Sequence, residues 1–193
     1  MKNTLRLITG LLAVAVMFAS PVAFAAMPLS AKQVESFLGS MKSVDSLTDE
    51  MKAAGKQEAL QAEMDKRAGV TFTPYVNSVT ILKEKYGPEY GKLGDIVKKH
   101  GFSSQEEWAN VGDAVMLSYM ALKAEKEPGF EKAATELTPE MMAQIPPETR
   151  AQVEKTMKMM NAIKAAPAEH KQVVTPFIAD IDKWIGEQQA AQQ

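Results

Sequence analysis

Residues 104–126 decide the fold, and they read SQEEWANVGDAVMLSYMALKAEK. Ser104 followed by Glu107 is typical of a capping box at the start of a helix. Apolar residues then recur at steps of three and four on one face, at Trp108, Val111, Val115, Tyr119 and Leu122. Three more widen this face, at Met116, Leu117 and Met120. Such breadth is typical of a central helix, so we predict one from Ser104 to about Lys126, with Trp108 anchoring the core.

Helix start signals also occur earlier in the chain. Ser30 and Gln33 form a second capping-box pattern, and the apolar face that follows comprises Val34, Phe37, Leu38 and Met41. A separate segment is expected from near Ser46 to about Arg67. It has few large apolar residues and contains Gly55, which weakens a helix, so we expect one exposed helix or a pair of short ones.

Proline marks the remaining helices. The dipeptide Thr-Pro occurs at positions 73–74, 138–139 and 175–176. Threonine suits the N-cap and proline suits the first helical position, so each pair predicts a helix start. Pro88 and Pro147 are expected to begin two more helices, which end at His100-Gly101 and at Ala166-Pro167.

The expected fold is all-α. It is an irregular bundle of about six to eight short and medium helices, because helical periodicity recurs with separate start signals along the chain. A single helical domain is expected over residues 26–186. A polar, disordered tail is expected over residues 187–193.

The first 25 residues have the pattern of a secretory signal peptide. Lys2 and Arg6 flank the start of an apolar run over residues 7–18, and Ala23 and Ala25 form an Ala-x-Ala cleavage site. The apolar run is short for a membrane span, which needs roughly 20 residues. We therefore predict export to the periplasm with cleavage after Ala25 or one residue later. A retained N-terminal anchor is the alternative.

Composition narrows the classes of function. The chain carries a formal net charge of −2, and only Arg67 and Arg150 would remain as arginines after cleavage. This balance disfavours nucleic acid as a partner. There is no cysteine, so disulfides contribute nothing to stability. No second apolar stretch approaches the length of a membrane span, so none is expected after processing.

Catalytic motifs are not found. The only histidines are His100, which is expected to cap a helix C-terminus, and His170, which lies between Glu169 and Lys171 and is expected to be exposed. No nucleophile elbow, zinc-protease motif or phosphate loop occurs. We therefore expect no enzymatic activity, no catalytic residue and no cofactor.

Methionine is the unusual residue, with 13 in the chain. Five gather late, at Met141, Met142, Met157, Met159 and Met160. Thioethers are ligands for Cu(I), so Met157, Met159 and Met160 form an alternative copper site. Methionine at helical spacing is more often core or an adaptable binding surface. Met157 and Met160 continue an apolar stripe from Val153 to Ile163, which favours packing.

Two short stretches resemble a family motif. Leu29-Ser30-Ala31-Lys32-Gln33 is similar to the Leu-Thr-x-x-Gln motif of the periplasmic stress chaperones of the Spy and CpxP type, with serine for threonine. Leu137-Thr138-Pro139-Glu140-Met141 resembles a second copy, with methionine for glutamine. The similarity covers ten residues, and the chain lacks a basic net charge. It implies chaperoning on a concave helical surface.

Taken together, the residues predict a periplasmic protein that binds a protein or peptide through an apolar, Met-containing face, and a chaperone-like activity is one form that this binding can take. The residues expected to contact the partner are Met141, Met142 and Ile145. A Cu(I)-binding protein that uses the late methionines is one alternative. An enzyme of no recognisable type is the other.

Overall fold

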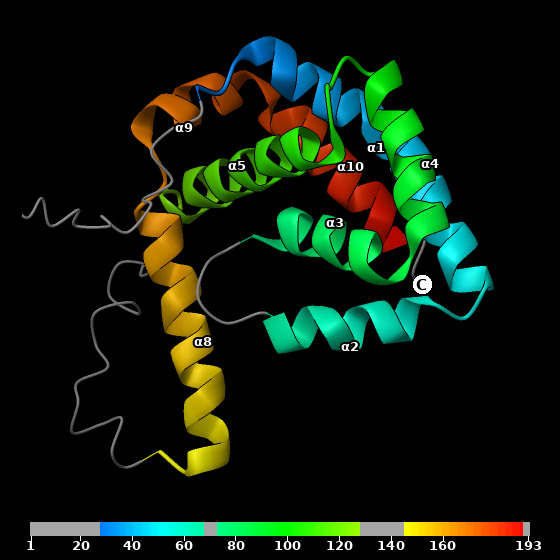
Figure 1. The fold of residues 1–193 in the computed structure, drawn as a ribbon. Helices are drawn as coiled ribbons and strands as arrows, with labels where there is room; N and C mark the ends of the chain where they lie inside the picture. Colours follow the sequence, from blue (N-terminus) through cyan, green and yellow to red (C-terminus); the bar gives the residue numbers. More distant parts are fainter. Residues whose placement is uncertain (1–27, 68–72, 128–144, 191–193) are drawn as a thin grey trace, which may run out of the picture.

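The computed structural model describes residues 28–67, 73–127 and 145–190. All regular secondary structure in these ranges is helical, so the all-α prediction of an irregular bundle is confirmed. Figure 1 shows the helices crossing at several angles rather than running parallel. Within the described ranges, no helix has both the length and the apolar character to cross a membrane. The signal-peptide prediction concerns residues outside these ranges.

Helix α1 (Ala31–Ala53) is a single long helix. Ser30 and Gln33 form the predicted capping box. The predicted separate start near Ser46 is wrong, because the buried stripe continues through Leu47 and Met51. Ser46 instead turns its hydroxyl back to the carbonyl of Lys42, which a helix interior tolerates.

The break between the first two helices lies at Gly55. Its φ of 68° lies in the left-handed region that glycine adopts without strain. Gly55 N–H donates to the Lys52 carbonyl and Lys56 N–H donates to the Met51 carbonyl, as in a Schellman motif. Helix α2 (Gln57–Arg67) then runs along α3 and buries no residue, as its composition predicted.

Two proline-initiated helices follow, α3 (Pro74–Lys85) and α4 (Gly87–Lys99). Thr73 is the N-cap of α3, as expected. His100 is the C-cap of α4, and Gly101 has a φ of 88°, so the predicted end of this helix is confirmed. Phe102 N–H donates to the Val97 carbonyl, and both side chains enter the core.

Helix α5 (Gln105–Ala124) lies at the centre, in contact with α1, α3, α4, α8 and α9. Ser104 is its N-cap and accepts from Glu107 N–H. The other half of the predicted capping box is displaced by one residue, because Glu107 accepts from Ser103 N–H. The predicted stripe is buried at Trp108, Val111, Val115 and Tyr119, while Leu122 is half-buried.

The C-terminal helices are α8 (Pro147–Lys164), α9 (Ala168–Val174), a 3-10 turn η1 (Thr175–Phe177) and α10 (Ile178–Ala190). Pro147 and Pro167 bound α8 as predicted. Thr175 does not begin an independent helix. Its hydroxyl donates to the Lys171 carbonyl, and the chain continues into α10 through one 3-10 turn.

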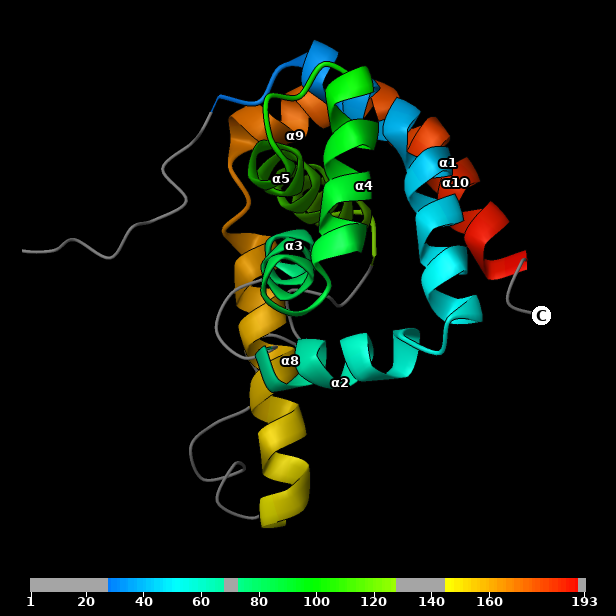
Figure 2. The ribbon, with the colours of Figure 1, turned by 45° about the vertical axis from the view of Figure 1, so that its right-hand side comes forward.

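The end of α10 differs from the polar tail expected from Glu187 onward. The helix continues to Ala190. Gln188 Nε2 donates to Asp45 on α1 at 2.6 Å, and Trp184 Nε1 donates to the same carboxylate at 3.2 Å. This polar link holds the last turns of α10 beside α1 (Figures 1 and 2).

Candidate functional site

Helix α8 carries the late methionines that the structure describes. It begins after Pro146, with Pro147 in the first turn, where a missing N–H costs nothing. Val153, Met157, Met160 and Ile163 recur along it at steps of four, three and three. This spacing places them on one side of the helix.

Among the described residues of α8, those at its C-terminal end are anchored in a hydrophobic cluster. Ile163 and Ala166 are buried against Ala121 of α5. The half-buried residues that surround this cluster are Leu117, Met120 and Ala124. The N-terminal half of α8 extends beyond the other described helices in both views (Figures 1 and 2).

The apolar side chains of this extended half are incompletely covered. Val153, Met157 and Met160 are half-buried, and they belong to neither hydrophobic cluster of the described residues. Met159 is 44% exposed, and no other large hydrophobic side chain in the described part of the chain is classed as exposed. We call residues 153–160 of α8 the α8 apolar segment.

The predicted partner-binding residues are only partly placed. Met141 and Met142, with the helix start at Thr138-Pro139, lie outside the described residues. Ile145 is half-buried just before α8, and its carbonyl accepts from Arg150 Nη2 at 3.1 Å. The structure therefore brings Ile145 close to the first turn of α8.

The late methionines do not point the same way. Met157 and Met160 share one side of α8, whereas Met159 is one residue removed and diverges by about 100°. A Cu(I) site needs soft ligands that converge on one point. No group of three or more His, Asp or Glu side chains suited to a metal ion occurs among the described residues.

The prediction that His170 is exposed is wrong. We expected exposure because charged residues flank it, yet its side chain is only 6% exposed. Adjacent helical residues point about 100° apart, so flanking charges do not report on the residue between them. Glu169 is exposed, and Lys171 pairs with Glu125 at the end of α5. His170 faces inward on α9, which packs on α5.

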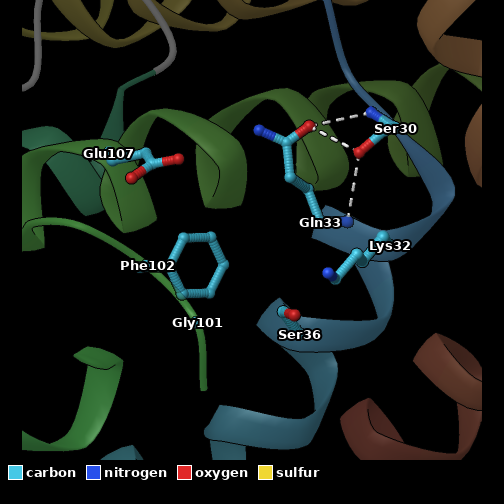
Figure 3. Close-up of a pocket in the computed structure, with 7 residues that line it drawn as sticks. All are labelled: Ser30, Lys32, Gln33, Ser36, Gly101, Phe102 and Glu107. Atoms are coloured by element: carbon cyan, nitrogen blue, oxygen red, sulfur yellow. Dashed lines mark hydrogen bonds between the residues drawn. The ribbon is translucent and has the colours of Figure 1, made fainter. Parts of the chain in front are cut away.

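A pocket of about 200 Å³ lies where the start of α1 meets the α4–α5 turn. Figure 3 shows the side chains around it. It is lined by Ser30, Lys32, Gln33, Ser36, Gly101, Phe102 and Glu107. Most of its polar groups already serve helix capping. Ser30 N–H donates to Gln33 Oε1 at 2.9 Å, and Gln33 N–H donates to Ser30 Oγ at 3.3 Å.

Glu107, on the far side of this pocket, is also engaged. It accepts from the N–H and hydroxyl of Ser103, and these hydrogen bonds lower its pKa. The capping hydrogen bonds around the pocket therefore hold two helix starts in place. The resemblance motif at residues 29–33 coincides with this capping box.

Asp113 is a buried carboxylate that the sequence analysis missed. It lies on α5, is 1% exposed, and accepts from the N–H groups of Tyr75 at 2.8 Å and Val76 at 3.2 Å. These are unpaired donors of the first turn of α3, so Asp113 caps a helix from a different helix. Burial raises the pKa of Asp113 to about 7, although both N–H bonds oppose the rise. The sequence signal that could have revealed this buried carboxylate is the position of Asp113 among the apolar residues of α5.

Comparison with known proteins gives no match: no family model fits the chain, and neither curated proteins nor solved structures show a similar protein.

Proposed function

We propose that this chain is an exported periplasmic protein that binds apolar segments of other polypeptides through the α8 apolar segment, by non-covalent contact and without catalysis. The observation that carries the proposal is the incomplete cover of this segment. Val153, Met157 and Met160 are half-buried outside both clusters, and Met159 is 44% exposed.

The anchoring of α8 supports this role. Ile163 and Ala166 hold its C-terminal end against α5, so the extended half is presented from a packed base. An isolated helix of this length is marginal in water, so such a base keeps it formed. Apolar surface that stays in water loses the stabilisation that burial would give, and a bound partner restores it.

Side-chain chemistry indicates the kind of partner. Methionine is unbranched and polarizable, so it adapts to apolar surfaces of different shape. Within the segment, charges of both signs lie beside the methionines, with Glu154 and Lys158 both exposed. A partner of one strong charge sign gains little from such a mixture of charges. We therefore propose an apolar helix or extended peptide segment without strong net charge as the ligand.

A pair of triple variants tests the proposal against copper binding. In one, Met157, Met159 and Met160 become glutamine, and in the other they become leucine. Glutamine has nearly the length of methionine and leucine nearly its volume, but only leucine remains apolar. If apolar contact drives binding, the leucine variant retains affinity for a fluorescent apolar peptide in anisotropy titrations, and the glutamine variant loses at least about tenfold.

The same variants are titrated with Cu(I) against a chelator. Tight, stoichiometric copper binding that both variants abolish would contradict the proposal, because neither glutamine nor leucine supplies a thioether. Asn161→Ala is the control, since it changes an exposed polar side chain on α8 that lies outside residues 153–160. It is expected to bind the peptide as the unmodified chain does.

A further inference from the structure

Helix α2 is weakly attached to the rest of the fold. None of its residues is buried. Leu60 is half-buried against the main core, and Met64 Sδ accepts a 3.4 Å hydrogen bond from Ser78 Oγ on α3. These two side chains are its main apolar contribution, so hydrophobic burial stabilises its docking only slightly.

Ion pairs make up much of the contact between α2 and α3. Glu63 pairs with Lys85 at 2.8 Å, and Arg67 pairs with Glu84. Hydrogen bonds from Lys85 and then Lys66 lower the pKa of Glu63 to about 2, so its charge persists at neutral pH. These side chains are partly exposed to solvent, and salt weakens such pairs.

A fully buried apolar residue lies beneath this contact. Ser78, Ile81 and Lys85 recur on α3 at steps of three and four, which places them on one side of the helix. Ser78 and Lys85 both contact α2, so Ile81 between them faces α2 as well. Ile81 is 0% exposed, although it does not belong to the main core of the described residues.

The N-terminal end of α2 is joined to α1 by the turn at Gly55 and to α4 by Lys56. Lys56 pairs with Glu89 on α4 and lies 6.0 Å from the centroid of the Tyr86 ring. Gly55, with its φ of 68°, directly precedes it. Movement of α2 would therefore pivot after Lys56 and leave α1 and α4 in place.

We propose that α2 is a salt-sensitive cover on α3, and that its opening about Lys56 exposes Ile81. Opening leaves the α5-centred core intact, because Leu60 is the one α2 side chain packed on that core in the described structure. Ionic strength then controls access to Ile81 on α3, a site that is distinct from the α8 apolar segment.

The absence of cysteine from the chain permits a direct probe of Ile81. In the variant Ile81→Cys, the labelling rate with a soluble thiol reagent is expected to rise about three- to tenfold between 20 and 500 mM NaCl, the range expected from screening two surface ion pairs. Val115→Cys, buried on α5, is the control and is expected to label slowly at both salt concentrations. Equal labelling of the two variants at both concentrations would overturn the proposal.

Hydrogen exchange, measured on variants without an added cysteine, distinguishes the ion pair between α2 and α3 from the ion pair inside α2. Lys85→Gln removes a link between α2 and α3, whereas Lys66→Gln removes a pair with the same Glu63 inside α2. We expect amides 57–67 to exchange about three- to tenfold faster in Lys85→Gln at low salt, and to be nearly unchanged in Lys66→Gln. If these amides exchange only together with those of α5 in every variant, α2 does not open separately and the proposal fails.

Discussion

The indole Nε1 of Trp108 donates a 2.8 Å hydrogen bond to Ser40 Oγ, and both side chains are buried. Ser40 in turn donates to the Phe37 carbonyl at 2.6 Å, so the polar handle of Trp108 ends on α1. The Trp108 ring also packs against Phe37 and Tyr75, at centroid distances of 5.6 and 5.4 Å. One residue of α5 thus joins α1 and α3.

Trp108→Ala is expected to lower the free energy of unfolding by about 3–5 kcal/mol, because it leaves a large cavity among three helices. Urea unfolding measures this change. Asn110→Ala, an exposed position on the same helix, is the control and is expected to change stability by less than about 0.5 kcal/mol. A loss below about 1 kcal/mol at Trp108 would show that the residue is not a core anchor.

Gly112 allows the close approach of two aromatic rings. A Cβ atom at this position would lie 2.6 Å from Phe37 Cε2 and 3.0 Å from Tyr75 Cγ. Gly112→Ala is therefore expected to lower the midpoint of urea unfolding, at a cost of about 1–3 kcal/mol from overpacking. At Gly91 on α4 a Cβ meets nothing within 4 Å, so Gly91→Ala is expected to stabilise by about 0.5–1 kcal/mol. Similar effects at both glycines would contradict this account.

Asp113 predicts an unusual dependence of stability on pH. Burial raises its pKa from 3.8 to about 7 in the folded state, so the folded chain binds more protons than the unfolded chain between these values. The stability from this group is complete below about pH 4 and is lost as pH rises through 7. The pKa values of Glu63 and Glu106 are lowered to about 2. Their contribution to the free energy of unfolding is therefore lost only as pH falls below their ordinary pKa of 4.5.

Asp113→Asn isolates this contribution, because asparagine has nearly the same shape but does not titrate. The advantage of the unmodified chain over Asp113→Asn in urea unfolding is expected to be larger at pH 5 than at pH 8. An advantage that grows with pH would show that Asp113 caps α3 as a stable carboxylate.

The N-terminal pattern predicts processing during export. Mass spectrometry of the protein from a periplasmic extract is expected to find Ala26 or Met27 as the first residue. Ala25→Leu replaces the small residue at the cleavage site and is expected to retain residues 1–25. Recovery of intact Met1 from the membrane fraction of the unmodified protein would instead show a retained anchor.

Local signals in the sequence predicted much of the helix pattern. Ser30, Ser104, Pro74 and Pro147 mark helix starts because capping and proline geometry act within one turn. The continuous α1 was missed because its apolar stripe includes Leu47 and Met51, which appeared too sparse to indicate burial. Whether such residues are buried depends on their packing partners in distant helices, which a single sequence does not specify.

The residues of the candidate site could be predicted from the sequence, but the position of α8 in the fold could not. The late methionines and the stripe from Val153 to Ile163 can be read directly from the sequence. Anchoring of only one end of α8 depends on how Ile163 meets Ala121, a contact between distant segments. The burial of Asp113 and His170 likewise follows from packing between helices, which helical periodicity alone does not reveal.

Site-specific photo-crosslinking locates the bound peptide on the surface of the protein. A photoreactive amino acid replaces Met159 in one variant and the exposed Gln172 on α9 in another. Each is irradiated with a labelled apolar peptide of low net charge. If the peptide binds at the α8 apolar segment, adducts form at position 159 and are competed by unlabelled peptide, and few adducts form at position 172. Equal adducts from both positions, or none from position 159 when anisotropy shows the peptide bound, would contradict binding at the α8 apolar segment.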